Sequence, residues 1–163
     1  MVASLENLIF IHGLEGSSHG VKASLLRGFY PEILTPDFRG DLSARMDQLN
    51  KILADKQDWT IIGSSFGGLM AALFTCQHPH QVRKAILLAP ALILFQEADY
   101  PMQPIDVPVI IYHGARDTVI PLQAVRPIAQ EIFASLDFHQ VDDDHGLYQT
   151  VHEIDWRKLL EKN

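Results

Sequence analysis

The sequence predicts a doubly wound α/β domain whose mostly parallel sheet has about six strands and helices on both faces. Two patterns predict it. Short, continuous apolar runs, typical of strands that are buried on both faces, recur along the chain. Between them lie stretches in which apolar residues are three or four positions apart, as they are on one face of a helix. Strands that alternate with helices are joined by right-handed crossovers, which make the sheet parallel.

Four strong strands and two weaker ones are expected. The strong candidates are continuous apolar runs at residues 8–11, 59–62, 85–88 and 109–112. The weaker candidates, which carry more polar side chains, are residues 32–35 and 138–141.

The helical patterns fall in the intervals between these strands. One-sided spacing of apolar residues marks the segments 21–29, 46–53 and 122–132, and an apolar helical stretch occupies residues 69–74. Ser43 can cap the second helix, and Pro121 stands where a first helical turn tolerates proline. Residues 148–160 are expected to form one last amphipathic helix.

Length and composition fit a single domain over residues 1–163, with 47% hydrophobic and 20% charged residues. The net charge of −7 disfavours nucleic acid as a partner, because neutralising phosphates requires clustered Lys and Arg. Cys76 is the only cysteine, and residues 1–7 have neither the basic start nor the apolar core of an export signal, so we expect a cytoplasmic protein. The longest apolar stretch, residues 85–95, is interrupted by Pro90 and is shorter than the roughly 20 residues that span a bilayer.

The motif G-x-S-x-G at residues 63–67 stands between a predicted strand and a predicted helix. Ligands of doubly wound sheets bind beyond the carboxyl ends of the strands, which is where this turn falls. Small residues at both ends of the motif allow a tight turn that exposes the Oγ of Ser65 as a nucleophile. The N–H of Phe66, at a helix N-terminus, would face the oxygen of an attacked carbonyl. A plain glycine-rich turn is the alternative interpretation, and Ser64 is the neighbouring candidate nucleophile.

The first predicted strand ends in a His-Gly turn that is expected to supply a second N–H donor. Here the N–H of Leu14 would meet that of Phe66 and complete a two-donor oxyanion hole. His12 could itself take part in catalysis, although a histidine in such a turn more often packs or hydrogen-bonds to hold the loop. The chain has neither the G-x-G-x-x-G nor the Walker motif of a phosphate-binding loop.

An acid and a base are expected after later strands. Asp117 follows the fourth strong strand, whereas Asp99 and Asp106 precede it and so fall at the wrong end of the sheet or in a crossover. His145 follows the last predicted strand, and its rival His152 falls within the final helix. We therefore assign Asp117 as the orienting acid and His145 as the general base.

Two neighbouring features have plainer interpretations. His113 is expected to pack at its strand end, and the three consecutive aspartates at 142–144 are expected to form a solvated acidic loop. Negative charge near His145 would favour the imidazolium that forms when the ring takes the serine proton.

Together these segments resemble the α/β-hydrolase superfamily over nearly the whole chain. The resemblance rests on residues 12–14, 36–40, 63–68, 114–117 and 144–146, and the order Ser65, Asp117, His145 is also that of the family. Within the superfamily the chain looks most like the small capless bacterial esterases of the YqiA type. This resemblance implies hydrolysis of esters or thioesters without a metal or an organic cofactor. The chain departs from the family pattern because the usual first two strands are missing and residues 91–107 are too short for a helical lid.

We therefore expect a serine hydrolase that cleaves a carboxylic ester or thioester of a small molecule through an acyl-enzyme on Ser65. The same triad could support perhydrolysis or amide cleavage, and the fold could also serve as a non-catalytic binding protein. Residues 91–95 could line an acyl pocket, with Leu92, Phe95 and Met102 contacting substrate, or could equally be core packing. The sequence indicates no particular acyl chain, oligomeric state or protein partner.

Overall fold

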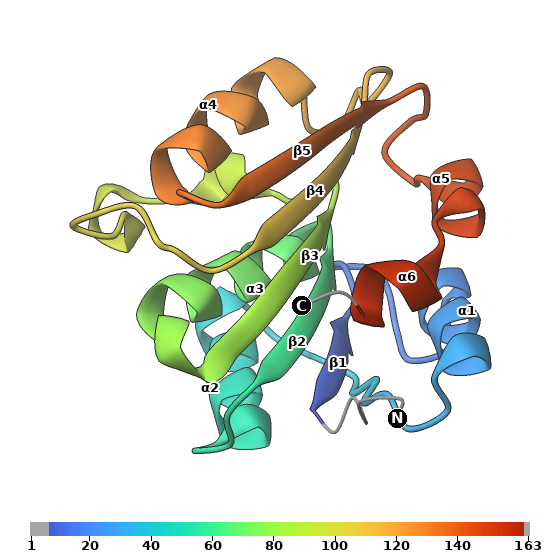
Figure 1. The fold of residues 1–163 in the computed structure, drawn as a ribbon, viewed down its shortest axis with the longest axis horizontal. Coiled ribbons are helices and arrows are strands. Elements are labelled where there is room, and N and C mark those ends of the chain that lie inside the picture. The colour runs from blue at the N-terminus through green and yellow to red at the C-terminus, as the bar shows by residue number, and fades with distance from the viewer. Residues whose placement is uncertain (1–6, 162–163) are drawn as a thin grey trace.

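The computed structural model describes residues 7–161. The two ends of the predicted domain, and most of the segment considered as an export signal, lie outside the described residues. Five parallel strands form one sheet in the order β1-β2-β3-β4-β5 (Figure 1). The strands are β1 (Leu8–Ile11), β2 (Trp59–Ser64), β3 (Val82–Leu88), β4 (Val109–Gly114) and β5 (Leu136–Val141).

Helices cover both faces of the sheet, which confirms the doubly wound α/β class. The larger apolar core lies between one face and the helices α2 (Leu42–Leu53), α3 (Phe66–Gln77) and α4 (Leu122–Ile132). A smaller core lies between the other face and the helices α1 (Val21–Phe29), α5 (Tyr148–Glu153) and α6 (Trp156–Glu161). Short 3-10 turns follow α3 and β3, and these are η1 (Pro79–Gln81), η2 (Leu92–Leu94) and η3 (Glu97–Asp99).

The weak strand expected at residues 32–35 is not a full strand. It forms a single parallel bridge between Leu34 and Ile9, with the N–H of Leu34 donating to Leu8. Pro31 and Pro36 flank the segment, and proline has no N–H to extend the pairing. The sheet of the described residues therefore has five strands rather than six.

Two helix boundaries also differ from the expectation. The cap of α2 is Asp41, whose side chain accepts the N–H of Ala44 at 2.9 Å, and Ser43 lies inside the helix. The last helix is divided, because Ile154 is extended and ends α5. Asp155 then accepts the N–H of Lys158 at 3.2 Å, so a second capping carboxylate starts α6.

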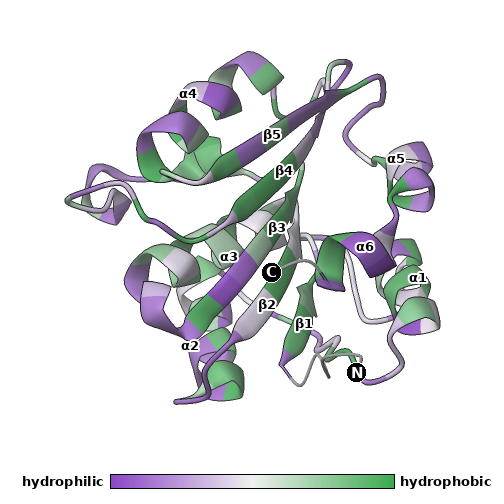
Figure 2. Ribbon diagram, viewed as in Figure 1, coloured by the Kyte–Doolittle hydropathy of each residue, from purple (hydrophilic) through white to green (hydrophobic). Residues whose placement is uncertain are grey.

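The distribution of hydropathy follows this layering. In Figure 2, β1 is hydrophobic throughout, whereas β5, at the opposite edge of the sheet, mixes hydrophobic and hydrophilic residues. This contrast agrees with burial, since every residue of β1 is buried and β5 is half-buried or exposed along its length. Among residues 7–161, no helix is both long and apolar enough to cross a membrane.

All five strands run parallel, so their carboxyl ends gather at one edge of the sheet. The register places Ile11, the last residue of β1, beside Gly63 of β2. The loops that follow β1, β2, β4 and β5 therefore start from this common edge, where the predicted site residues lie.

Candidate active site

Ser65 lies on a sharp turn between the end of β2 and the start of α3. Its backbone has φ 56° and ψ −113°, and this positive φ is one that residues other than glycine seldom adopt. A Cβ on Gly63 would overlap the carbonyl of Gly67, and a Cβ on Gly67 would overlap the carbonyl of Ile11. Close backbone contacts on both sides therefore hold the serine out at the carboxyl edge of the sheet.

Three side chains from separate loops form a continuous hydrogen-bonded row at this edge. The Oγ of Ser65 lies 2.9 Å from Nε2 of His145, and Nδ1 of His145 lies 2.7 Å from Oδ2 of Asp117. A carboxylate only accepts hydrogen bonds, so Nδ1 carries the proton and Nε2 of the neutral ring accepts from the Ser65 hydroxyl. Such a row can activate a serine as a nucleophile.

The carboxylate of Asp117 is buried, and both of its oxygens have partners. Oδ1 accepts the backbone N–H groups of Val119 at 2.9 Å and Ile120 at 2.8 Å. Oδ2 accepts from His145 and also lies 3.3 Å from Nε2 of His113. These contacts fix the orientation of the carboxylate toward His145.

His113, expected only to pack at a strand end, is also in contact with the acid. The ring is fully buried, and its Nε2 donates to the carbonyl of Ile120 at 2.8 Å. Its Nδ1 has no hydrogen-bond partner among residues 7–161. Burial lowers the pKa of His113, although its hydrogen bond to Ile120 and the charge of Asp117 oppose this effect. The His-Gly pair before the acid loop, which repeats the pair after β1, is the sequence signal that could have indicated this contact.

The loops that carry the acid and the base are joined along their backbones. The N–H of Ala115 donates to Val141 at 2.8 Å, and that of Arg116 donates to Asp143 at 3.0 Å. A Cβ on Gly114 would overlap the carbonyl of Asp143. Glycine at position 114 therefore lets the two loops touch, which brings Asp117 within reach of the histidine.

The run of three aspartates is only in part the solvated loop that was expected. Asp142 and Asp144 are exposed, and Asp142 forms an ion pair with Arg116 at 2.9 Å. Asp143 is buried, and its carboxylate accepts the N–H of Thr150 at 3.0 Å and the hydroxyl of Thr150 at 2.8 Å. Burial alone would raise the pKa of Asp143, but hydrogen bonds from Thr150 and Asp144 outweigh it and lower the pKa. Asp143 thus ties the base loop to α5.

The two N–H groups expected to form an oxyanion hole come from the loop after β1 and from the turn after β2. Within residues 7–161, neither the N–H of Leu14 nor that of Phe66 donates to a protein acceptor. The first loop lies against the nucleophile, since a Cβ on Gly13 would be 3.5 Å from the Cβ of Ser65. Both donors are therefore available to an oxygen bound beside Ser65.

His12 hydrogen-bonds within its own loop region and not to the triad. Its Nδ1 donates to the carbonyl of Gly13 at 2.6 Å, and its Nε2 accepts the N–H of Phe38 at 2.9 Å. Since one ring nitrogen donates and the other accepts, the ring is neutral. Its rival as base, His152, lies exposed on α5 with Nδ1 bonded to the carbonyl of Tyr148 at 2.6 Å.

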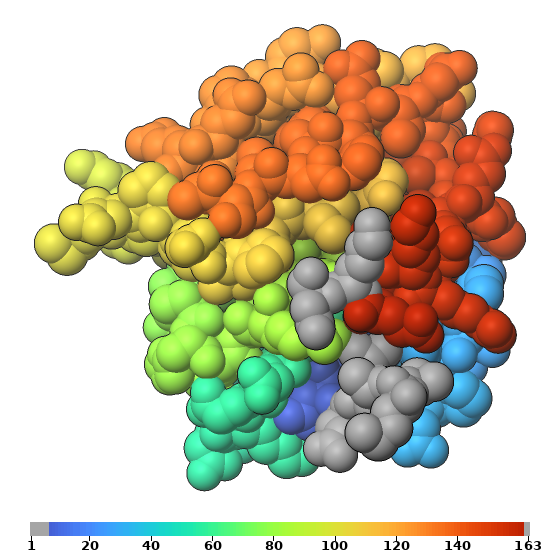
Figure 3. Space-filling model, viewed as in Figure 1, coloured from blue at the N-terminus to red at the C-terminus, as the bar shows by residue number. Residues whose placement is uncertain are grey.

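The three residues expected to contact substrate lie in different environments. Leu92 and Phe95 are buried and belong to the larger core, where Phe95 packs edge-on against Tyr100 with ring centroids 5.6 Å apart. Met102 is fully exposed. Figure 3 shows the segment around residue 100, in yellow, projecting from the body of the molecule. The structure therefore places Leu92 and Phe95 in the core and Met102 at the surface, and their contact with substrate stays a prediction.

Two cavities border the loop after β1. One of about 570 Å³ is lined by Leu14, Arg39 and Arg45 among others, and the other, of about 130 Å³, is lined by Gly13 and Ser64 among others. Both lie next to the segment that carries the N–H of Leu14.

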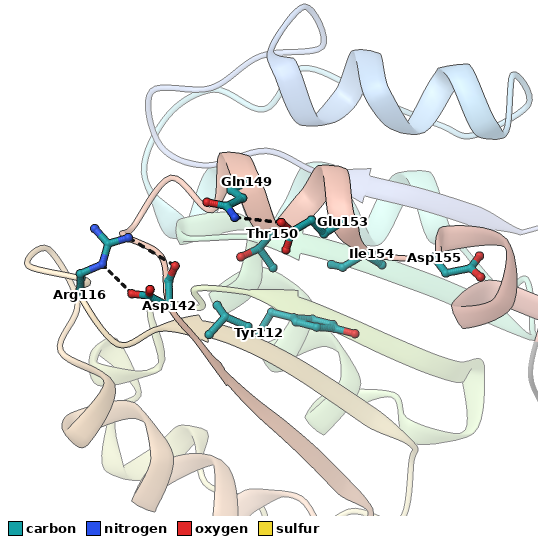
Figure 4. A pocket seen from close by; sticks show the side chains of 9 residues that line it. Tyr112, Arg116, Asp142, Gln149, Thr150, Glu153, Ile154 and Asp155 are labelled. Atoms are coloured by element: carbon teal, nitrogen blue, oxygen red, sulfur yellow. Dashed lines mark hydrogen bonds and ion pairs between the residues drawn. The ribbon is translucent and has the colours of Figure 1, made fainter.

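A third cavity lies away from the triad. This groove, of about 500 Å³, is lined by Tyr112 of β4 and by Thr150 and Glu153 of α5 (Figure 4). Arg116 is paired with Asp142 at its mouth. None of the three triad residues lines the groove. Residues 7–161 contain no cluster of three or more His, Cys, Asp or Glu side chains that could hold a metal ion.

Known proteins share the fold described above. A family model described as the α/β-hydrolase fold matches residues 28–104, which include the turn at Ser65 but neither Asp117 nor His145. None of the curated proteins matches the chain significantly by sequence.

Similar solved structures extend the likeness to both ends of the sheet. A protein of the α/β hydrolase superfamily from Xanthomonas campestris pv. campestris is 26% identical, with a TM-score of 0.77 over 97% of this chain and 98% of that one. Est1E from Butyrivibrio proteoclasticus, solved with ferulic acid bound, is 15% identical, with a TM-score of 0.76 over 94% of this chain and 86% of that one. An esterase from a marine microorganism is 18% identical, with a TM-score of 0.73 over 96% of this chain and 94% of that one.

The family match covers the nucleophile turn, and the structural match covers nearly the whole length of the chain. On both grounds the chain has the α/β-hydrolase fold.

Proposed function

We propose that this protein is a serine hydrolase that cleaves carboxylic esters or thioesters of small molecules through an acyl-enzyme on Ser65. The observation that carries the proposal is the unbroken row from the Ser65 hydroxyl through His145 to the buried carboxylate of Asp117. A binding-only protein has no need of a serine held on a strained turn against a histidine oriented by a buried acid.

In the proposed mechanism, His145 Nε2 takes the hydroxyl proton of Ser65 as Oγ attacks the acyl carbonyl carbon. The carbonyl π electrons move onto oxygen, and the N–H groups of Leu14 and Phe66 bind this oxyanion. When the carbonyl re-forms, the bond to the alcohol or thiol breaks, and His145 returns the proton to the leaving group. Water then repeats the attack on the acyl-enzyme, which releases the acid and regenerates Ser65.

The short connection after β3 supports small substrates. Between β3 and β4 the chain forms only the 3-10 turns η2 and η3, so no helical lid domain covers Ser65 from this connection. Esterase names among the similar structures, Est1E and the marine esterase, favour an ester bond as the target. We therefore place the chain among small capless esterases, with ester or thioester as substrate class.

Replacing the nucleophile tests the proposal directly. Ser65→Ala is expected to abolish labelling by a fluorophosphonate probe and to reduce hydrolysis of p-nitrophenyl butyrate by on the order of 10⁶. Ser64→Ala is the matched control, because Ser64 is the adjacent serine and takes no part in the row, and it should keep labelling and turnover.

Two results would contradict the proposal. Hydrolysis by Ser65→Ala at the wild-type rate would exclude Ser65 as nucleophile. The second test uses the folded wild-type protein with the probe and a panel of esters, thioesters and amides. If the protein reacts neither with the probe nor with any ester or thioester, this hydrolase chemistry is excluded.

A further inference from the structure

Arg45 is a buried cation without an acidic partner. Its side chain is on the first turns of α2 and only 5% of the residue is exposed. Within the described residues, no carboxylate forms an ion pair with it. Burying an unpaired charge is costly, so the contacts that the guanidinium does make must compensate.

Those contacts join three separate segments of the chain. Nε donates to the carbonyl of Gly40 at 2.9 Å, and one terminal nitrogen, Nη2, donates to the carbonyl of Leu14 at 3.2 Å. Cζ lies 5.5 Å from the centroid of the Phe66 ring, within the range of a cation–π interaction. Nη1 is buried and has no hydrogen-bond partner in the part of the chain that the structure describes, so the Phe66 ring adds to the stabilisation that the two carbonyls give.

Leu14 and Phe66 are the two residues whose N–H groups form the proposed oxyanion hole. They come from different loops, and their backbones share no hydrogen bond in the described structure. A single guanidinium contacts both, through the Leu14 carbonyl and the Phe66 ring. The planar fork of arginine can hold two carbonyls and a ring at once, whereas lysine has a single flexible point of charge.

We propose that Arg45 is a positioning residue that holds the two donors of the oxyanion hole in register. This inference rests on the proposed function, because it assigns Arg45 to the step in which negative charge develops on the substrate oxygen. The two N–H donors bind the substrate oxygen most strongly once it carries negative charge, so a loss of their register weakens binding of the transition state more than binding of the substrate. The contribution therefore belongs to the transition state and not to substrate binding.

The test compares two arginines that line the same cavity. Arg45→Met keeps the length of the side chain and its packing but removes the hydrogen bonds and the charge. Arg39→Met is the matched control, since Arg39 is exposed beside the same cavity and its hydrogen bonds, with Gln48, use only backbone atoms. Both variants lose one positive charge from the same region.

With p-nitrophenyl butyrate as substrate, we expect Arg45→Met to lower kcat about 10- to 100-fold and to leave KM within about twofold of wild type. A loss of kcat of this size is close to that caused by removing one oxyanion donor. Arg39→Met should stay within about twofold in both constants. A trifluoromethyl ketone, which forms a tetrahedral adduct with the serine, should bind Arg45→Met more weakly by the same factor as kcat/KM falls. A merely structural role would not couple these two losses.

Several outcomes would overturn the inference. They are an unchanged kcat in folded Arg45→Met, a rise in KM alone, an equal loss in Arg39→Met, or a tetrahedral adduct whose affinity does not follow kcat/KM. If Arg45→Met does not fold, Arg45→Lys replaces it in the test. Lysine keeps the charge but not the planar fork, so kcat should still fall. A wild-type kcat in Arg45→Lys would also overturn the inference. Failure of the proposed function is distinguishable, because it appears as activity that survives in Ser65→Ala.

Discussion

The nucleophile turn and the loops that carry the acid and base are positioned by different kinds of force. At the turn, backbone approaches backbone: Gly63 and Gly67 leave no room for a Cβ, and Ser65 takes a positive φ between them. In the acid and base loops, buried polar side chains satisfy one another, and the carboxylates of Asp117 and Asp143 accept backbone N–H groups. Close backbone packing shapes the turn at Ser65, whereas the acid and base loops combine one such contact, at Gly114, with hydrogen bonds between buried polar groups.

This difference explains why the two halves tolerate change differently. A tight turn fails when any atom is added, because the neighbouring backbone cannot move away. A hydrogen-bonded loop fails when a donor or acceptor is changed, even if the shape is kept, because a buried polar group then loses its partner. An added methyl group should therefore do most harm at the turn, and an isosteric change of a polar group should do most harm in the acid and base loops.

Of the changes that compare the two halves, an isosteric one in the hydrogen-bonded half, Asp117→Asn, is expected to have the largest effect. Oδ1 accepts two N–H groups, so the amide oxygen should stay there and the NH₂ should face His145. The ring would then accept at Nδ1 and carry its proton on Nε2, which could no longer accept from Ser65. We expect kcat for p-nitrophenyl butyrate to fall about 10⁴-fold with the fold intact.

The control for this change is Asp142→Asn. Asp142 is exposed and pairs with Arg116, so its replacement should leave kcat within about twofold, because surface ion pairs contribute little. Asp117→Asn activity within tenfold of wild type would mean that the acid does not set the histidine tautomer.

The opposite experiment adds one methyl group to the steric half. Gly67→Ala places a Cβ against the carbonyls of Ile11 and His12, both of which belong to the backbone. We expect the free energy of unfolding in urea to drop by about 3 kcal/mol, since the overlap requires the end of β1 to move. Activity should fall with it, because the same shift moves the loop that carries Leu14.

A glycine in an open position provides the comparison. A Cβ on Gly28, within α1, meets nothing within 4 Å. Gly28→Ala should therefore raise the free energy of unfolding by about 0.5–1 kcal/mol, as alanine favours helix. If Gly67→Ala were as stable as wild type, the turn would not owe its shape to steric exclusion.

The same contrast determines how much of the molecule could be predicted from the sequence. The glycines of the turn at Ser65 stand at a fixed spacing in the sequence, so the turn could be predicted. The alternation of strands and helices could be predicted from the spacing of apolar residues. The strand expected at 32–35 failed because Pro31 and Pro36 limit its pairing, and the divided last helix depends on the cap at Asp155. Periodicity alone does not include such local effects.

Contacts between segments far apart in sequence were the part that could not be predicted. Whether an aspartate is solvated or buried depends on what packs over it, and only the fold brings Thr150 to Asp143. The same is true of Arg45, which sequence position marks as an ordinary helical residue. Leu92 and Phe95 are the reverse case. The sequence could not distinguish a substrate contact from core packing for these residues, and in the fold both belong to the larger core.

The smallest predicted effect concerns His113 and the stability of the hydrogen-bonded half in acid. Burial lowers the pKa of His113, and among residues 7–161 its Nδ1 has no acceptor for a second proton, so the native ring stays neutral to a lower pH than a free imidazole does. In the unfolded chain the ring takes up a proton below about pH 6.5. Unfolding then binds a proton, so this contribution to stability is complete above pH 6.5 and is lost as the pH falls toward the lower native pKa.

We expect the unfolding free energy of wild type to fall between pH 7 and 5 more steeply than that of His113→Asn, by at most about 1.4 kcal/mol per pH unit. Urea titrations of both proteins at pH 8, 7, 6 and 5 measure this difference, and parallel curves would mean that His113 is protonated alike in the folded and unfolded states.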